Sequence, residues 1–134
     1  MQEKKLHVLL IDDYEPTNFL HRMILEETDL VHNISVCLTA QIGLQFLKET
    51  DSVPDIIVLD INMPAMTGWE FLEHYQKEGY TKNKSIILMV SSSLNPDDGV
   101  RAVDHPLVSA YYSKPMTEEN VHEVISRFFQ KSTI

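Results

Sequence analysis

The chain has 134 residues, of which 43% are hydrophobic and 23% are charged, and its formal net charge is −9. This balance is typical of one compact globular domain, and the sequence has neither an apolar run of membrane-spanning length nor a signal-peptide pattern. We therefore expect a cytoplasmic protein without membrane insertion, and the acidic balance argues against a nucleic-acid partner, which would require a basic face.

Short apolar runs alternate with helical patterns from the start of the chain. Residues 6–11 form a nearly continuous apolar run, which is typical of a strand buried on both of its faces. Pro16 is suited to the first turn of a helix. Three apolar residues, Leu20, Met23 and Ile24, follow it at helical spacing. The first element pair is therefore predicted to be a strand followed by a helix.

The middle of the chain repeats this alternation. A weaker strand is expected at 34–38, and Gly43 is expected to weaken the helix after it. Residues 55–59 form another apolar run. Thr67 and Glu70 fit a capping box at the start of the next helix. The inward stripe of that helix is predicted to consist of Trp69, Leu72 and Tyr75.

The last part of the chain completes the pattern. Residues 86–90 predict a further buried strand, and Asn95 predicts the cap of the helix that follows. Pro106 should end this helix early, before a weaker strand at 109–112. Thr117 is expected to cap the last helix. The apolar stripe of that helix consists of Val121, Val124, Ile125, Phe128 and Phe129.

Alternation of five strands with five helices predicts an α/β fold in which a doubly wound, five-stranded parallel sheet has helices on both faces. In such sheets the reactive site forms beyond the carboxyl ends of the strands, where the winding direction reverses. Residues that end strands are therefore the functional candidates. The predicted strands end in Asp12-Asp13, in Asp60, in Ser91-Ser92-Ser93 and in Ser113-Lys114-Pro115.

The residue types at these strand ends suit phosphoryl chemistry at a metal ion. Carboxylates a few ångströms apart repel one another, and a divalent cation relieves that repulsion. Mg²⁺ prefers oxygen ligands and keeps several waters, so carboxylates, a backbone carbonyl and water suit it. One carboxylate can attack phosphorus and form an aspartyl phosphate. A lysine and a serine hydroxyl can then contact the phosphoryl oxygens.

Over residues 6–129 the chain resembles the receiver domain of response regulators in two-component systems. The matching motifs lie at 10–13, 55–64, 67–68, 91–92 and 114–115. The resemblance implies a flavodoxin-like, CheY-like fold with the strand order 2-1-3-4-5. It also implies a Mg²⁺-dependent phosphoacceptor function.

The resemblance assigns the acidic residues to a phosphorylation and metal site. Asp60 is implied to be the phosphoacceptor and a metal ligand. Asp13 is implied to bind Mg²⁺ directly, and Asp12 beside it to bind through water. The backbone carbonyl of Asn62 is implied to complete the metal site.

The remaining matched residues are implied to support the phosphoryl group and the switch. Ser91 matches the hydroxyl residue that bonds a phosphoryl oxygen, and Ser92 matches the small residue after it. Lys114 matches the lysine that pairs with the phosphoryl group. Pro115 matches the residue after that lysine, where the family often has a cis bond. Tyr111 matches the aromatic switch position, which turns inward when the hydroxyl residue moves.

Several positions depart from the family pattern. Thr67 stands where aspartate is common, and Gly43 stands where alanine is usual and should loosen its helix. Residues 103–108 lack the usual Gly-Ala, which affects the signalling face and leaves a dimer mode unassigned. Asn62 and Ser93 flank the site where the family tunes its phosphoaspartate lifetime. Because neither is acidic, we predict a moderately long-lived phosphoryl state; a half-life of seconds with Mg²⁺ would contradict this.

The resulting hypothesis is a single-domain response regulator that spans residues 1–134, with a core at about 6–131 and no output domain. It takes its phosphoryl group from a sensor histidine kinase or a histidine phosphotransfer protein. Phosphorylation then switches a surface that docks a downstream protein. It is expected to catalyse only its own phosphorylation and dephosphorylation, so it is not classed as an enzyme.

Three alternatives were weighed against this hypothesis. An aspartyl phosphatase requires Asp-x-Asp after the first strand, whereas Asp12 and Asp13 are adjacent. A flavin carrier requires a Ser/Thr/Gly-rich phosphate loop there, whereas residues 13–16 are acidic. The main alternative is a degenerate receiver that binds proteins without phosphorylation. The complete set of acidic, hydroxyl and lysine residues argues against it, and a divalent-metal titration separates the two.

Overall fold

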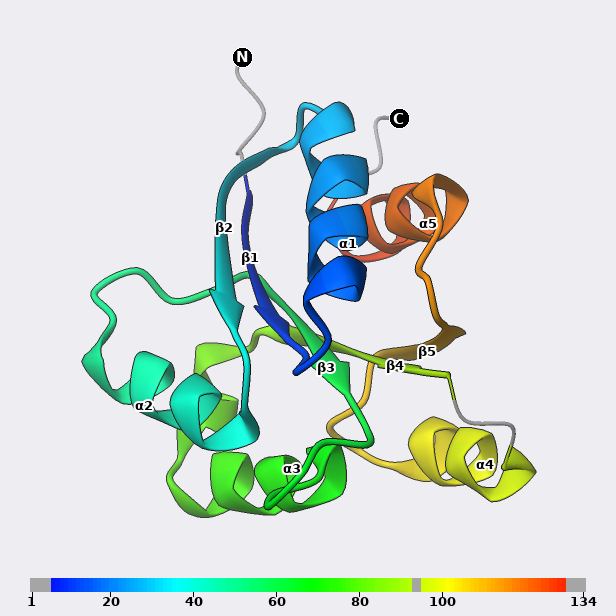
Figure 1. Cartoon of the computed structure of the whole chain (residues 1–134). Coiled ribbons are helices and arrows are strands. Elements are labelled where there is room, and N and C mark those ends of the chain that lie inside the picture. Colours follow the sequence, from blue (N-terminus) through cyan, green and yellow to red (C-terminus); the bar gives the residue numbers. More distant parts are fainter. Residues whose placement is uncertain (1–5, 93–94, 130–134) are drawn as a thin grey trace.

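The computed structural model describes residues 6–92 and 95–129. Strands and helices alternate along the chain as predicted (Figure 1). The strands are β1 (Leu6–Ile11), β2 (Val31–Cys37), β3 (Ile56–Asp60), β4 (Ile86–Ser91) and β5 (Ala110–Ser113). The helices are α1 (Glu15–Glu27), α2 (Ala40–Glu49), α3 (Gly68–Lys77), α4 (Pro96–Asp104) and α5 (Glu118–Phe128), with a 3₁₀ helix, η1 (Tyr80–Asn83), after α3.

The strands form one parallel sheet in the order β2-β1-β3-β4-β5, which confirms the predicted fold class. Every residue of β1 and β3 is buried, which explains why both strands read as apolar runs in the sequence. The chain passes from β1 to β2 on one side and then crosses to β3 on the other side of β1. The carboxyl ends of β1 and β3 therefore flank the point where the winding direction reverses.

Helices cover both faces of the sheet (Figure 1). One core layer joins the sheet to α1 and α5 through Leu25, Val121 and Val124. The other joins it to α2, α3 and α4 through Leu47, Phe71 and Ala102. Burying these apolar side chains is the main force that holds each helix against the sheet. The strand ends, and the side chains at those ends, therefore lie along one edge of the sheet between the two helical layers.

The predicted helix starts are confirmed. Thr67 and Glu70 form a reciprocal capping box at the start of α3, because each side chain accepts a hydrogen bond from the other residue's backbone N–H. Asn95 caps α4 by accepting from the backbone N–H of Asp97. Thr117 caps α5 in the same way as Thr67 caps α3. α4 ends at Asp104, ahead of Pro106, as expected.

The strand boundaries differ from the sequence-based expectation in small ways. The second strand begins earlier than expected, at Val31, and ends at Cys37, whose thiol is free and buried. The fifth strand is shifted to Ala110–Ser113. β3 and β4 extend by one residue to include Asp60 and Ser91, because these polar residues still pair within the sheet. The functional candidates Asp60 and Ser91 are therefore held by strand pairing rather than by loops.

Two helices differ from their predicted description. In α1 the apolar residues Leu20 and Met23 are 38% and 42% exposed, whereas Asn18 and His21 are buried. In α2, Gly43 does more than weaken the helix. A Cβ at Gly43 would lie 2.7 Å from Cδ1 of Ile11, so the glycine allows α2 to pack directly on β1.

Candidate functional site

The turn after β1 carries the first two acidic residues. Asp12 is 3% exposed, and its Oδ1 accepts a hydrogen bond of 2.9 Å from the backbone N–H of Tyr14. Its backbone carbonyl accepts a hydrogen bond of 2.8 Å from Nδ2 of Asn18. Asp13 is exposed. The turn is therefore fixed at Asp12 and presents Asp13 to solvent.

Asp60 ends β3 and is only 2% exposed. The loop after it returns directly to the strand, because the backbone N–H of Gly68 donates to the carbonyl of Ile61 at 2.8 Å. A Cβ at Gly68 would lie 2.5 Å from the Asp60 carbonyl oxygen, so only glycine permits this close approach. The start of α3 thus packs against the backbone of the proposed phosphoacceptor.

Lys114 follows β5 and reaches the two buried carboxylates. Its Nζ lies 2.7 Å from Oδ2 of Asp12 and 2.9 Å from Oδ1 of Asp60. Its backbone N–H donates to the carbonyl of Ser91 at 3.0 Å, which fixes the segment against the end of β4. The peptide bond between Lys114 and Pro115 is cis, the form that the resemblance led us to expect.

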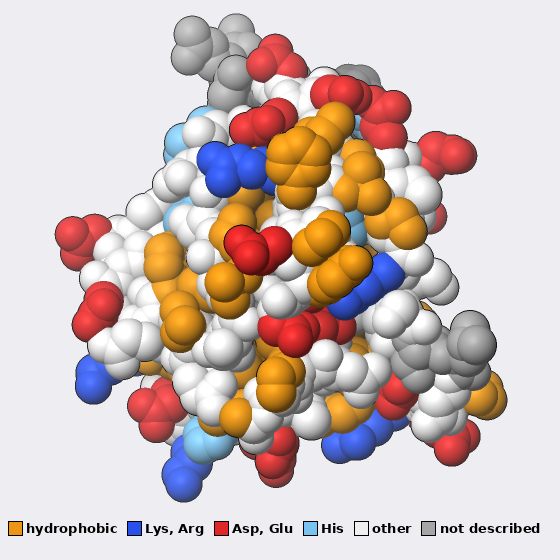
Figure 2. Space-filling view, viewed as in Figure 1, with side chains coloured by type: hydrophobic (Ala, Val, Ile, Leu, Met, Phe, Trp, Pro, Cys, Tyr) orange, Lys and Arg blue, Asp and Glu red, His pale blue; other side chains and the backbone are white. Residues whose placement is uncertain are grey.

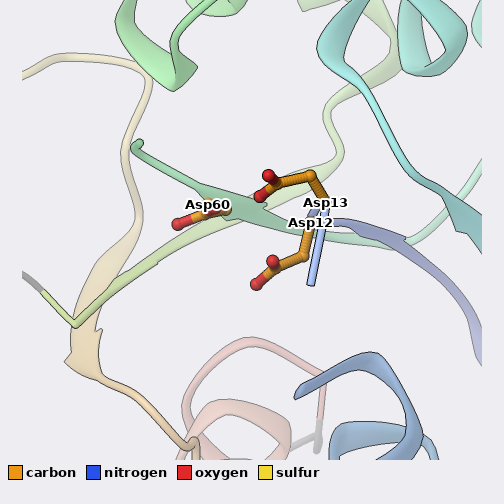
Figure 3. A group of neighbouring side chains, drawn as sticks. All are labelled: Asp12, Asp13 and Asp60. Carbon is orange, nitrogen blue, oxygen red and sulfur yellow. The ribbon is translucent and has the colours of Figure 1, made fainter. Parts of the chain in front are cut away.

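The acidic group contains more negative charge than the lysine compensates. One carboxylate oxygen from each of Asp12, Asp13 and Asp60 lies within 4.8 Å of the others. Figure 3 shows the three side chains projecting from the ends of β1 and β3 toward the same side. Three carboxylates beside the ammonium group of Lys114 are oxygen donors with excess negative charge, a donor set that suits Mg²⁺.

Burial dominates the electrostatics of Asp60. Removal from water has the largest effect and raises the pKa of its carboxyl, the hydrogen bond from Lys114 lowers that pKa, and the charge of Asp12 raises it. The resulting pKa is about 6. For Lys114, burial by itself lowers the pKa, but its bonds to Asp12 and Asp60 outweigh this effect and raise it. The lysine therefore stays protonated, whereas the Asp60 carboxylate is held in its charged form only by its neighbours.

The site opens into a cleft of about 530 Å³. Its walls include six of the predicted site residues, namely Asp13, Asp60, Asn62, Ser92, Lys114 and Pro115. Figure 2 shows acidic and basic side chains side by side in this region, with apolar side chains of the α1 surface next to them. Asp60 and the exposed Asp13 thus lie at the wall of a cleft that opens to solvent.

Ser91 ends β4, and Tyr111 lies in the neighbouring strand β5. Alternation along β4 places Ser91 on the same face as Met89, and Met89 pairs with Tyr111 in the sheet. Ser91 is buried and Tyr111 is half-buried, with its ring close to Gly99 of α4. The predicted switch pair is therefore on one face, next to α4. Ser93, which was predicted to flank the site, lies outside the described residues.

Sequence reasoning missed two buried polar residues of α1. Asn18 and His21 are 4% and 1% exposed, and both contact the segments that carry the site. Their signal in the sequence was the spacing of Asn18, His21 and Leu25 at i, i+3 and i+7, which marks one helix face. That signal was hidden because the apolar residues Leu20 and Met23 also recur at helical spacing.

Comparison with known proteins identifies the family. The sequence matches the response regulator receiver domain over residues 8–126. It is 35% identical over 85 residues to the sensor histidine kinase CheAY of Helicobacter pylori, covering 63% of this chain and 10% of that protein. It is 26% identical to the transcriptional regulatory protein CitT of Halalkalibacterium halodurans, covering 95% of this chain and 54% of that protein. The chain thus spans about half or less of the length of these curated relatives.

Solved structures agree with this assignment. A two-component response regulator from Cytophaga hutchinsonii superposes with a TM-score of 0.86 at 35% identity, covering 92% of this chain and 97% of that one. A receiver protein from Dyadobacter fermentans shares the fold with a TM-score of 0.81 at 24% identity, covering 93% and 98% of the two chains. The chain belongs to the response regulator receiver family, a family of signalling domains in two-component systems.

The surface helices give no sign of a membrane span. Within residues 6–92 and 95–129, every helix is too short or too polar to cross a bilayer.

Proposed function

We propose that this receiver domain accepts a phosphoryl group on Asp60 in a Mg²⁺-dependent reaction. The observation that carries the proposal is the position of Asp60: its Oδ1 lies 2.9 Å from Lys114 Nζ, beside Asp12 and Asp13, at the wall of an open cleft. Asp12, Asp13, Asp60 and the Asn62 carbonyl would hold Mg²⁺, which neutralises charge on the phosphoryl oxygens when bound.

The transfer requires a donor that carries a phosphorylated histidine, so we infer a sensor histidine kinase or a histidine phosphotransfer protein as the partner. A carboxylate oxygen of Asp60 forms a bond to phosphorus, and the bond from phosphorus to the imidazole nitrogen of the donor breaks. Lys114 contacts the phosphoryl oxygens, and Ser91 donates a hydrogen bond to one of them. Such donors act in the cytoplasm, where we place this protein.

The response is a switch in a protein-docking surface. Phosphorylation adds negative charge and acceptor oxygens at Asp60, and Ser91 gains a contact that is absent before phosphorylation. Because Tyr111 is on the same face of the sheet as Ser91 and next to α4, we propose that its side chain moves inward when Ser91 moves. The surface formed by α4, β5 and α5 would then change its affinity for a downstream protein.

Intact-mass measurement with acetyl phosphate and Mg²⁺ tests the proposal, with Asp60→Asn as the control variant. We expect the wild type to gain one phosphoryl group, the control to gain none, and a chelator to abolish the gain. Absence of both phosphorylation and Mg²⁺ binding in the wild type would instead identify a degenerate receiver that binds its partners without phosphorylation.

A further inference from the structure

Helix α1 turns a polar face toward the sheet. Asn18 and His21 lie one helical turn apart and are 4% and 1% exposed, and Leu25, one turn further on, is 2% exposed. Burial of an asparagine and a histidine is costly unless their polar groups are hydrogen-bonded. The contacts of these two side chains therefore indicate what the helix face does.

His21 holds the segment that follows Lys114. Its Nε2 accepts a hydrogen bond of 2.9 Å from the backbone N–H of Met116, which is itself 1% exposed. The two residues are 95 positions apart in the chain, so the bond joins α1 to the connection between β5 and α5. Because Met116 is only two residues beyond Lys114, this bond fixes the backbone from which the lysine extends.

Asn18 holds the partner of that lysine. Its Nδ2 donates to the backbone carbonyl of Asp12 at 2.8 Å. Its Oδ1 is buried and has no hydrogen-bond partner within residues 6–92 and 95–129, and an unsatisfied buried acceptor is destabilising. The asparagine thus contributes through its donor alone, and one face of α1 anchors both sides of the contact between Lys114 and Asp12.

The hydrogen bond to Met116 requires a neutral imidazole. Nε2 can accept only when the ring proton is on Nδ1, because an imidazolium ion has no free acceptor. Burial lowers the pKa of His21; the charge of Asp12 opposes this, and that of Lys114 adds to it. The neutral form that the geometry needs is therefore also the form that the environment favours.

We propose that His21 is a positioning residue for phosphoryl transfer: by anchoring the backbone of Met116, it holds Lys114 between Asp12 and Asp60. The inference rests on the phosphoacceptor function proposed above. Lysine has a flexible four-carbon side chain, so its ammonium group stays near the reacting oxygens only if its backbone is fixed. Removing the anchor should slow phosphorylation roughly tenfold, the size of effect seen when the supporting contacts of a reactive site are lost.

The test compares four variants of the whole chain. His21→Leu removes the acceptor and keeps an apolar side chain of similar size, and His21→Phe is a second variant of this kind should the first fail to fold. His21→Gln keeps an acceptor on a side chain of similar reach. Leu25→Val perturbs the same buried face but keeps the hydrogen bond from Met116 to His21. Each protein is assayed for its rate of phosphoryl gain from acetyl phosphate with Mg²⁺, for amide hydrogen exchange at Met116, and for stability in urea.

We expect His21→Leu to phosphorylate about tenfold more slowly and to lose protection of the Met116 amide. His21→Gln should recover most of both, and Leu25→Val should keep both, whatever its loss of stability. A wild-type rate in His21→Leu, or an equal slowing in Leu25→Val, overturns the proposal. If the wild type takes no phosphoryl group, the function proposed for Asp60 fails separately. In that case hydrogen exchange at the Met116 amide still tests the anchor. Retained protection in His21→Leu rules out the anchor, and lost protection supports it.

Discussion

The two ends of the central strands differ in how well their buried polar groups are compensated by neighbouring groups. At the amino end, His7 is 2% exposed, and its ring nitrogens lie 3.0 Å from the hydroxyl of Ser35 and 3.3 Å from that of Ser52. At the carboxyl end, Asp12 and Asp60 are equally buried but share one ammonium group with the exposed Asp13 nearby. The buried imidazole at the amino end is hydrogen-bonded within the fold, whereas the carboxyl end retains excess negative charge.

Burial favours the neutral form at both ends, with different consequences. It lowers the pKa of His7, and the neutral imidazole is the form that exchanges hydrogen bonds with neutral hydroxyls. It raises the pKa of Asp60 to about 6, although only the ionised carboxylate can attack phosphorus. The carboxyl end therefore gives up stability to keep a charge that, under the function proposed above, reacts with phosphorus and is compensated by Lys114 and Mg²⁺.

Removing the cation should have the largest effect. Lys114→Met leaves the buried carboxylates without their partner, and we expect a loss of about 3–5 kcal/mol in the free energy of unfolding in metal-free buffer. Added Mg²⁺ should restore part of this stability. Urea unfolding with and without chelator measures both effects. The exposed Lys48 provides the matched control, because Lys48→Met should stay within about 0.5 kcal/mol of the wild type.

Neutralising the proposed phosphoacceptor should change the stability in the opposite direction. Because the folded pKa of Asp60 is about 6, above its ordinary value of 3.8, its contribution to stability is complete below pH 3.8 and is lost as the pH rises through 6. Asp60→Asn avoids that loss, and we expect it to be more stable than the metal-free wild type by about 1–3 kcal/mol at pH 7.5. The gap should narrow as the pH falls toward 5; a gap independent of pH would contradict this assignment. Urea unfolding across this pH range measures it.

The close approach of α3 to Asp60 gives a third prediction. Gly68→Ala places a Cβ against the Asp60 carbonyl, and since the backbone must shift, we expect a loss of about 1–3 kcal/mol and slower phosphorylation. Gly99 is the matched control, because a Cβ there meets nothing closer than 3.5 Å. Gly99→Ala within α4 should instead stabilise the protein by about 0.5–1 kcal/mol. Thermal unfolding of the two variants compares them, and equal effects would refute the steric explanation.

The smallest effect is expected at the amino end. His7→Phe leaves the hydroxyls of Ser35 and Ser52 without their ring partner, at a cost of about 1 kcal/mol because both are partly accessible to water. Mg²⁺ affinity and phosphorylation rate should not change. Calorimetry with Mg²⁺ and the intact-mass assay check this. A clear change in the Mg²⁺ affinity or in the phosphorylation rate would show that the two ends of the strands are coupled and do not act independently.

Local patterns in the sequence determined much of the fold and most of the site residues. The apolar runs of β1, β3 and β4 were recognisable because parallel strands are buried on both faces. Thr67 was recognisable as a cap because its partner Glu70 is only three residues away. Asp60 and Lys114 were recognisable as candidates because each follows a predicted strand, and the carboxyl ends of parallel strands share one edge.

Tertiary structure alone decided which face of α1 is buried. Leu20 and Met23 fit the helical period, yet Asn18 and His21 are turned inward, since the Asp12 carbonyl and the Met116 N–H need partners there. Likewise, Gly43 looked like a weak point in the sequence, whereas the structure places it against Ile11 of β1, whose side-chain end would have to shift to admit a Cβ. Such requirements come from atoms distant in sequence, as in the bond between His21 and Met116, so the helical spacing of Asn18 and His21 does not by itself show that their face is the buried one.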